Sequence, residues 1–296
     1  MTAKYENMVG KVFKTNSGTD CVIIEFNHSR DMKIKFLDKF GHEMNTYLPD
    51  LRKGKVKNPF APAVCGVGYL GAGKYKPSIN GVKTLAYVQW HGMIRRGYSD
   101  EHKKKNPSCE KSYVCDDWHC FDTYAEWFYQ QKGWDRGFHL DKDIKGDGTQ
   151  KYSPETCSLV PHEINTLLNN NSHKDNGFPL GVSIEHWSKD FLSMISKYGK
   201  IQRIGVYKTA QEAFHAYKKK REQYIKEVAL HWREYLDEDV YDLLYNIEVG
   251  ESGCLSKEES AFKFYETGEV EIPEHYQENL HLVCDERVEG LEDDYD

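Results

Sequence analysis

The chain has 296 residues, which suggests two or three small domains rather than one. Hydrophobic residues make up 39% and charged residues 29% of the sequence, a balance that supports a packed core and argues against global disorder. No apolar run reaches the roughly 18–20 residues of a membrane span, and the first residues lack the apolar segment of a secretory signal. We therefore expect a cytoplasmic protein without a membrane partner, whose eight cysteines stay reduced.

The net charge of −7 is unevenly distributed along the chain. Residues 251–296 hold 15 acidic and 3 basic side chains, a balance of −12, so the first 250 residues carry +5. A mildly basic body can approach a phosphate backbone, whereas the acidic tail cannot. The tail could act as a DNA mimic, fold back on a basic surface, or form a solubilising and partly disordered extension, and we favour the last alternative.

Short β-like runs alternate with turn signals over residues 9–58. The turns are expected at residues 16–18 and 38–41, which contain glycine together with Asn, Ser or Asp. Four or five short strands in this stretch predict a small β-barrel module, which we delimit as residues 1–58.

Amphipathic helices are predicted further along the chain. Residues 84–98 place four apolar side chains near one helical face, those of Leu85, Val88, Met93 and Ile94. Residues 116–131 form a second, aromatic-rich helix by the same criterion. Three short strands over residues 177–209 then precede a long helix over residues 210–236. Its inner face is predicted to include Ala213, Ala216, Tyr217 and Tyr224.

The stretch HLDKDIKGDGTQKYSPETCSLVPHEIN, residues 139–165, is typical of a β-hairpin followed by the start of a helix. A carboxylate and a helix-borne ligand in such a unit could hold a divalent cation beside a phosphate. The simpler interpretation is that Asp141 and Asp143 are hairpin turn residues. In that case His162, which follows Pro161, is an early helical residue without a ligand role.

This stretch resembles the HNH family of ββα-metal nucleases, especially a phage and bacterial branch with a pattern close to LDRIDNDGxYSPENCRWAT. The aromatic stretch VCDDWHCFDTYAEWF, residues 114–128, is similar to the Cys-x-x-Trp-x-x-Phe stretch of that branch. The resemblance covers roughly residues 66–170 and implies an HNH-like nuclease domain over residues 66–172. It implies Mg²⁺ or Mn²⁺ as the cofactor and phosphodiester hydrolysis as the reaction.

Carried over by position, Asp141 matches the metal-binding Asp and Asn165 matches the final helix position, a metal ligand in many members. Lys142 falls where the general-base His usually stands, and Thr156 takes the place of the middle Asn. His139 or His162 could replace the missing base, and Lys142 could neutralise phosphate charge. Because His162 lies three residues before Asn165, both share a helical face and could join Asp141 as metal ligands.

A structural zinc is not expected, although Cys109, Cys115, Cys120 and His119 lie close together in the sequence. Their spacing contains no Cys-x-x-Cys, the usual arrangement of a zinc knuckle. Cys115 and Cys157 are predicted to be reduced core thiols.

Residues 177–228 resemble the Apetala-type DNA-binding domain of plant ethylene-response factors, which also occurs in phage homing endonucleases. The resemblance is carried by Gly181–Val182, Trp187, Gly199–Lys200 and IGVYKTAQEAFHAY, residues 204–217. It implies a three-stranded sheet that enters the major groove of DNA and is backed by a helix. The implied contact residues are His186, Trp187, Lys189, Lys197, Lys200, Gln202 and Arg203.

Two features set this segment apart from the plant domains. Ser183 and Glu185 stand on strands where those domains carry several Arg, which weakens the case for sequence-specific binding. We also expect at least two of Trp187, Phe191 and Tyr207 to be core residues rather than base contacts.

The sequence thus predicts a multidomain α+β protein, with residues 229–296 as a helical and acidic extension. The leading hypothesis is a homing-like, phage-type HNH endonuclease or nickase acting on double-stranded DNA in a bacterial cytoplasm, alone or as a homodimer or with a protein partner. One alternative is a catalytically silent DNA-binding or regulatory protein, since two signature positions depart from the family. Another is an interaction protein that acts through its acidic tail.

Overall fold

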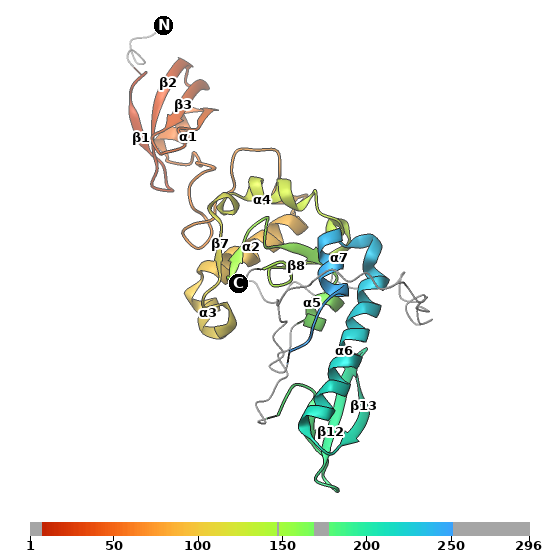
Figure 1. The fold of residues 1–296 in the computed structure, drawn as a ribbon. Helices are drawn as coiled ribbons and strands as arrows, with labels where there is room; N and C mark the ends of the chain where they lie inside the picture. Colours follow the sequence, from red (N-terminus) through yellow and green to blue (C-terminus); the bar gives the residue numbers. More distant parts are fainter. Residues whose placement is uncertain (1–7, 147, 169–177, 251–296) are drawn as a thin grey trace. The chain divides into compact units, whose positions relative to one another are not determined.

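The computed structural model describes residues 8–146, 148–168 and 178–250. It combines helices with mainly antiparallel sheets, which confirms the predicted α+β class (Figure 1). The described part divides into two compact units, separated in the chain between Gln130 and Gln131. Residues 149–154 return to the first unit. None of the described helices is both long and apolar enough to span a bilayer.

The first unit begins with a four-stranded antiparallel meander. Its strands are β1 (Val12–Lys14), β2 (Asp20–His28), β3 (Asp31–Phe36) and β4 (Glu43–Thr46). Alternate side chains of β2 and β3 are buried, and helix α1 (Leu48–Arg52) adds Leu48 and Leu51 to the same core. No ladder joins β1 to β4 in the described residues, so an open sheet stands where the sequence predicts a closed barrel.

The remainder of this unit packs around two aromatic helices. Its elements are β5 (Ser78–Ile79), β6 (Val82–Lys83), α2 (Leu85–Tyr98), α3 (Asp100–Lys105), η2 (Pro107–Cys109), β7 (Tyr113–Val114), η3 (Asp116–His119), α4 (Phe121–Phe128) and β9 (Lys151–Tyr152). The indole N–H of Trp90 donates to the carbonyl of Trp118 over 2.8 Å, and both rings are almost completely buried. This bond satisfies a polar group that burial would otherwise leave unpaired.

The predicted helix over residues 116–131 is interrupted near its start. It consists of the 3₁₀ turn η3 followed by the α-helix α4. Cys120 between them is extended, with φ −84° and ψ 121°, because it forms a parallel β-bridge with Tyr69. A bridge to a residue about fifty positions earlier is invisible to helical periodicity, which explains the difference.

The second unit contains the hairpin and helix predicted for residues 139–165. The 3₁₀ turn η4 (Trp134–Arg136) precedes strand β8 (His139–Asp141), which pairs antiparallel with β10 (Ser158–Val160). Helix α5 (His162–Leu168) follows β10 after one residue. These three elements form a ββα unit.

A three-stranded antiparallel sheet with a long helix completes the second unit (Figure 1). Its elements are β11 (Val182–Ile184), β12 (Phe191–Lys197), β13 (Lys200–Tyr207), α6 (Ala210–Trp232), η5 (Arg233–Tyr235) and α7 (Glu238–Tyr245). Thr209 and Glu212 form a capping box that starts α6. Gly181 has φ +76°, and a Cβ there would overlap the Tyr217 ring, so only glycine fits this approach of the strand to the helix.

The ββα unit and the sheet share one hydrophobic core. Ile164 and Leu167 of α5 belong to the same buried cluster as Val182 and Ile195 of the sheet and Phe214 of α6. The buried side chain of Arg221 in α6 also donates to the carbonyl of Leu167. Movement of the sheet relative to the hairpin would therefore expose apolar surface. Of the predicted inner face of α6, Ala213, Tyr217 and Tyr224 are buried and Ala216 is half-buried.

Candidate active site at strand β8 and helix α5

Strand pairing brings His139 next to the start of helix α5. The register sets His139 opposite Val160, two residues before the helix begins. The rings of His139 and His162 lie 4.8 Å apart between centroids. The side-chain amide nitrogen of Asn165 lies 3.5 Å from Nδ1 of His139. Three of the predicted site residues, from two elements, therefore converge.

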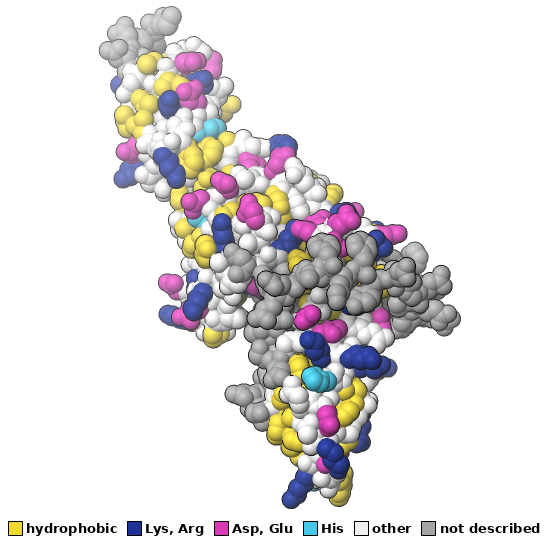
Figure 2. Space-filling model, viewed as in Figure 1, with side chains coloured by type: hydrophobic (Ala, Val, Ile, Leu, Met, Phe, Trp, Pro, Cys, Tyr) yellow, Lys and Arg dark blue, Asp and Glu magenta, His cyan; other side chains and the backbone are white. Residues whose placement is uncertain are grey.

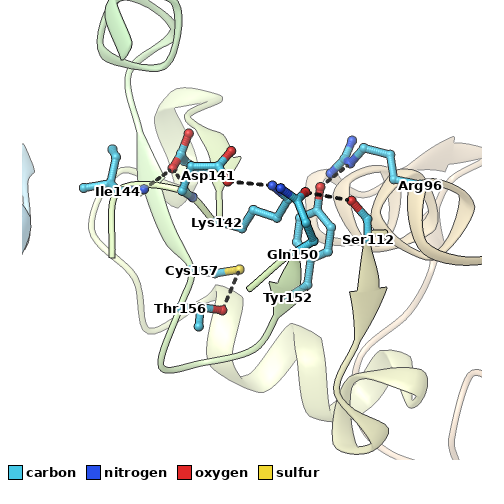
Figure 3. Close-up of polar contacts among 10 residues, drawn as sticks. Arg96, Ser112, Asp141, Lys142, Ile144, Gln150, Tyr152, Thr156 and Cys157 are labelled. Atoms are coloured by element: carbon cyan, nitrogen blue, oxygen red, sulfur yellow. Dashed lines mark hydrogen bonds and ion pairs between the residues drawn. The ribbon is translucent and has the colours of Figure 1, made fainter. Parts of the chain in front are cut away.

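Asp141 lies two residues after His139 on β8, and alternation along a strand directs both side chains to the same face. Its carboxylate is buried, and Oδ1 accepts hydrogen bonds from the backbone N–H groups of Asp143 over 2.8 Å and Ile144 over 2.9 Å (Figure 3). Burial raises the pKa of Asp141 above its usual value, while the two N–H donors act against the increase. Asp141 thus shapes the turn after β8, as the simpler interpretation expects, and its second oxygen has no protein donor among the described residues.

Lys142 forms an ion pair with its neighbour Asp143. Its ammonium nitrogen lies 2.6 Å from Oδ1 of Asp143, and its side chain is only 11% exposed. The ion pair is thus formed with Asp143 and not with Asp141, whose carboxylate stays available. The Lys142 side chain is directed at Asp143 in this pair.

Thr156, at the position of the middle Asn, is buried just before β10. Its hydroxyl lies 3.9 Å from the thiol of Cys157, which is fully buried and unoxidised. The predicted core role of Cys157 is confirmed, whereas Cys115 is only half-buried. The contact to His139 comes from Asn165 instead of from Thr156.

The side chains of this site do not by themselves enclose a metal ion. Among the described residues, no group of three or more His, Cys, Asp and Glu side chains could hold a metal ion. Asp141, His139 and His162 therefore do not form a closed three-ligand cage. Mg²⁺ needs none, because it is commonly bound by one or two carboxylates with water and substrate phosphates. A cation beside Asp141 would also offset the desolvation of its buried carboxylate.

His119, which lies close to three cysteines in the sequence, contacts a tyrosine and an aspartate. Nε2 of His119 lies 2.8 Å from the hydroxyl of Tyr98, which itself donates to the carbonyl of Val114. Nδ1 of His119 lies 4.0 Å from a carboxylate oxygen of Asp116. His119 therefore ties helix α2 to the turn before α4.

The predicted DNA-contact residues lie on the sheet and its turns. Trp187, in the turn between β11 and β12, is 89% exposed, and the His186 ring lies 5.4 Å from it between centroids. Lys189, Lys200 and Gln202 are also exposed. Figure 2 shows basic and hydrophobic side chains next to each other in the region of β12 and β13.

Two of the predicted contacts are already paired. Lys197 binds Glu227 of helix α6, and Arg203 lies 2.8 Å from Glu185 across the sheet. Phe191 and Tyr207 pack against the core, which confirms the expectation that at least two of the three aromatic side chains are structural.

Sequence reasoning did not anticipate the pairing of Lys142 with Asp143 or the contact between Asn165 and His139. The second could have been inferred from the hairpin register, because one residue separates β10 from α5. No protein-family model matches the chain, and neither the curated proteins nor the solved structures contain a match.

Proposed function

We propose that the protein is a metal-dependent endonuclease or nickase that hydrolyses phosphodiester bonds in double-stranded DNA. The observation that supports this most directly is the convergence of His139, His162 and Asn165. Asp141, whose carboxylate is buried, lies two residues further along β8. In this proposal β8, β10 and α5 are an HNH-type ββα unit, the four-stranded sheet is an accessory module, and β11–β13 with α6 form the DNA-binding module of a homing-like, phage-type enzyme.

Asp141 and His162 would hold a Mg²⁺ or Mn²⁺ ion, which would stabilise the negative charge that develops on the phosphate during hydrolysis. His139 accepts the proton of the attacking water, the step for which Lys142 is unsuited. The Asn165 amide nitrogen faces Nδ1 of His139 and can donate to it. With the amide turned over, its oxygen would accept the Nδ1–H and leave Nε2 as the proton acceptor. Asn165 is then a positioning residue rather than the metal ligand that the family resemblance implies.

DNA would be held by exposed groups of the sheet, Trp187, Lys189 and Lys200 foremost. Lys197 and Arg203 would first have to leave their carboxylate partners, which lowers the net gain from a phosphate contact. Because the sheet and α5 share one core, DNA held by the sheet would be kept at a fixed distance from His139.

A second candidate function is DNA binding without cleavage. It is favoured by Lys142 and Thr156, since these two signature positions are occupied by an ion-paired lysine and a buried threonine. The acidic residues 251–296, on which an interaction role would depend, lie outside the described residues. The two candidates differ in one readout, namely whether bound DNA is cut.

Incubation of supercoiled plasmid with purified protein tests the proposal. We expect relaxed or linear product with Mg²⁺ or Mn²⁺ and intact plasmid with EDTA. Retention of plasmid in a gel shift without cleavage in either metal supports the DNA-binding alternative instead.

A further inference from the structure

A groove in the first unit has the composition of a nucleic-acid site. It has a volume of about 610 Å³ and is open to solvent. Its walls include Lys74, Tyr75, Lys76, Ile79, Asn80 and Tyr129. None of the described residues that line it is acidic. The groove therefore offers aromatic, cationic and amide groups together.

The stretch of sequence that supplies most of the groove lining is rich in basic residues. Residues 51–99 contain nine Lys and Arg and no Asp or Glu. One groove lysine is partly neutralised, because the ammonium of Lys74 lies 2.9 Å from a carboxylate oxygen of Glu126 in α4. Lys76 is exposed, lines the groove and has no ion pair with the described residues. Such a surface attracts polyanions.

Two tyrosines form a stacked pair in the groove wall. The rings of Tyr75 and Tyr129 lie 5.3 Å apart between centroids at 26° to each other. The hydroxyl of Tyr75 donates to Glu126 over 3.0 Å, which fixes the orientation of its ring. A fixed aromatic face beside lysines can stack an unpaired base while the lysines hold the adjoining phosphates.

The hairpin β5–β6 borders the groove and ends in an apolar tip. Asn80 and Gly81 both have positive φ, +53° and +85°, as a two-residue hairpin turn requires. Ile79 and Val82, directly paired across the strands, are 59% and 66% exposed. Neither side chain contributes to a core, whereas apolar side chains at such a tip can contact bases that have left the stack.

We propose that this groove and the tip of hairpin β5–β6 bind single-stranded nucleic acid, with a base on the tyrosine pair and a phosphate on Lys76. Stacking on an aromatic face does not depend on base identity, so binding would be tolerant of sequence. The site would engage an unpaired stretch of the DNA substrate. The proposal deepens the nuclease proposal, yet binding needs neither metal nor cleavage and is tested without them.

The experiment measures the affinity of the full chain for a labelled oligothymidine and for a duplex of equal length, both in EDTA across a salt series. Lys76→Ala should lower the slope of log affinity against log salt by about 0.7, the loss of one phosphate contact. Lys104→Ala, at an exposed lysine of α3, serves as the matched control and should leave the slope unchanged.

Tyr129→Ala should weaken oligothymidine binding about tenfold, and Tyr129→Phe should retain it, because stacking needs the ring and not the hydroxyl. Neither variant should change duplex binding by a comparable factor. The proposal is overturned if Lys76→Ala and Tyr129→Ala both bind oligothymidine as tightly as the wild type does. It is also overturned if these variants lose as much affinity for the duplex as for oligothymidine. Because Lys76 is exposed, its variant keeps the test valid if Tyr129→Ala fails to fold.

Discussion

The side-chain amide of Asn165 on helix α5 lies 3.5 Å from Nδ1 of His139 on strand β8. These residues are 26 positions apart in the sequence, and the hairpin register joins them. The contact links the only helix of the ββα unit to its first strand at the edge where the rings of His139 and His162 meet. It restricts the orientation of the His139 ring, as the proposed role of a general base requires.

Asp141 has a role in the turn, and the proposed function gives it a second, separable role in catalysis. Asp141→Asn keeps an oxygen for the N–H groups of Asp143 and Ile144 and removes a buried charge. We expect the free energy of unfolding of this variant to be at least as high as that of the wild type. We expect its DNA cleavage activity to be lost. Asp141→Ala should lose cleavage and also about 1–3 kcal/mol of stability for an unsatisfied buried N–H. Urea denaturation measures the difference, and equal stability of the two variants would contradict the turn role.

His162 and His139 should differ in their effect on metal binding. His162→Ala removes a proposed ligand, so Mn²⁺ affinity measured by calorimetry should fall together with cleavage. His139→Ala and Asn165→Ala should bind Mn²⁺ as the wild type does, while the cleavage rate falls about 10²–10⁴-fold in His139→Ala. Added imidazole should partly restore His139→Ala. Loss of Mn²⁺ affinity in Asn165→Ala would return Asn165 to the role of a metal ligand.

Lys142 should be replaceable. Its partner Asp143 has a side chain that is 60% exposed, so the pair has little net effect on stability. Lys142→Met should change the unfolding free energy by less than about 1 kcal/mol and the cleavage rate by no more than a few-fold. A loss of cleavage as complete as that of Asp141→Asn would show that Lys142 acts on the reacting phosphate.

Trp187 should contribute to DNA binding without contributing to stability. At 89% exposure its side chain has little packing to lose. Trp187→Ala should therefore leave the melting temperature unchanged and weaken duplex affinity in a gel shift by about tenfold. Leu243→Ala, which removes another exposed apolar side chain, is the control. Unchanged duplex affinity in Trp187→Ala would remove the β11–β12 turn from the interface.

His119 should make the first unit sensitive to acid. Desolvation lowers the pKa of His119 below its ordinary 6.5, so the unfolded chain binds the proton more readily than the folded chain. The stability that depends on neutral His119 is therefore complete above pH 6.5 and is lost as the pH falls below it. Thermal melts between about pH 7.5 and about pH 5 should show this decline in stability. Both limits lie about one unit or more from the ordinary histidine pKa of 6.5. The decline should be shallower in His119→Gln than in a control variant at the exposed His28.

The local elements of the site were predictable, because residues 139–165 carry a strand, a turn and a helix start in direct succession. Alternation and helical spacing likewise located α2, α6 and the three strands of the sheet. Contacts between distant positions outside the hairpin register were not predictable. The bridge from Tyr69 to Cys120 cut a helix short, and the open edge of the N-terminal sheet depends on pairing that turn signals do not specify.

Side-chain partners were the least accessible to sequence reasoning. Lys142 has Asp141 and Asp143 as neighbours in the chain, and only the course of the turn decides which carboxylate it meets. The sequence also could not decide whether Trp187 is exposed, because an aromatic residue near a strand end suits a core as well as a binding surface.

Plasmid cleavage by Asp141→Asn and Asp143→Asn, chemically identical changes two positions apart, tests the central claim most directly. Asp141 is buried at the end of β8, whereas Asp143 is exposed and paired with Lys142. In Mg²⁺ or Mn²⁺, the wild type and Asp143→Asn should nick or cut supercoiled DNA, and Asp141→Asn should leave it intact. Equal cutting by the wild type and Asp141→Asn, or intact plasmid with the wild type in both metals, would contradict a nuclease site at β8 and α5.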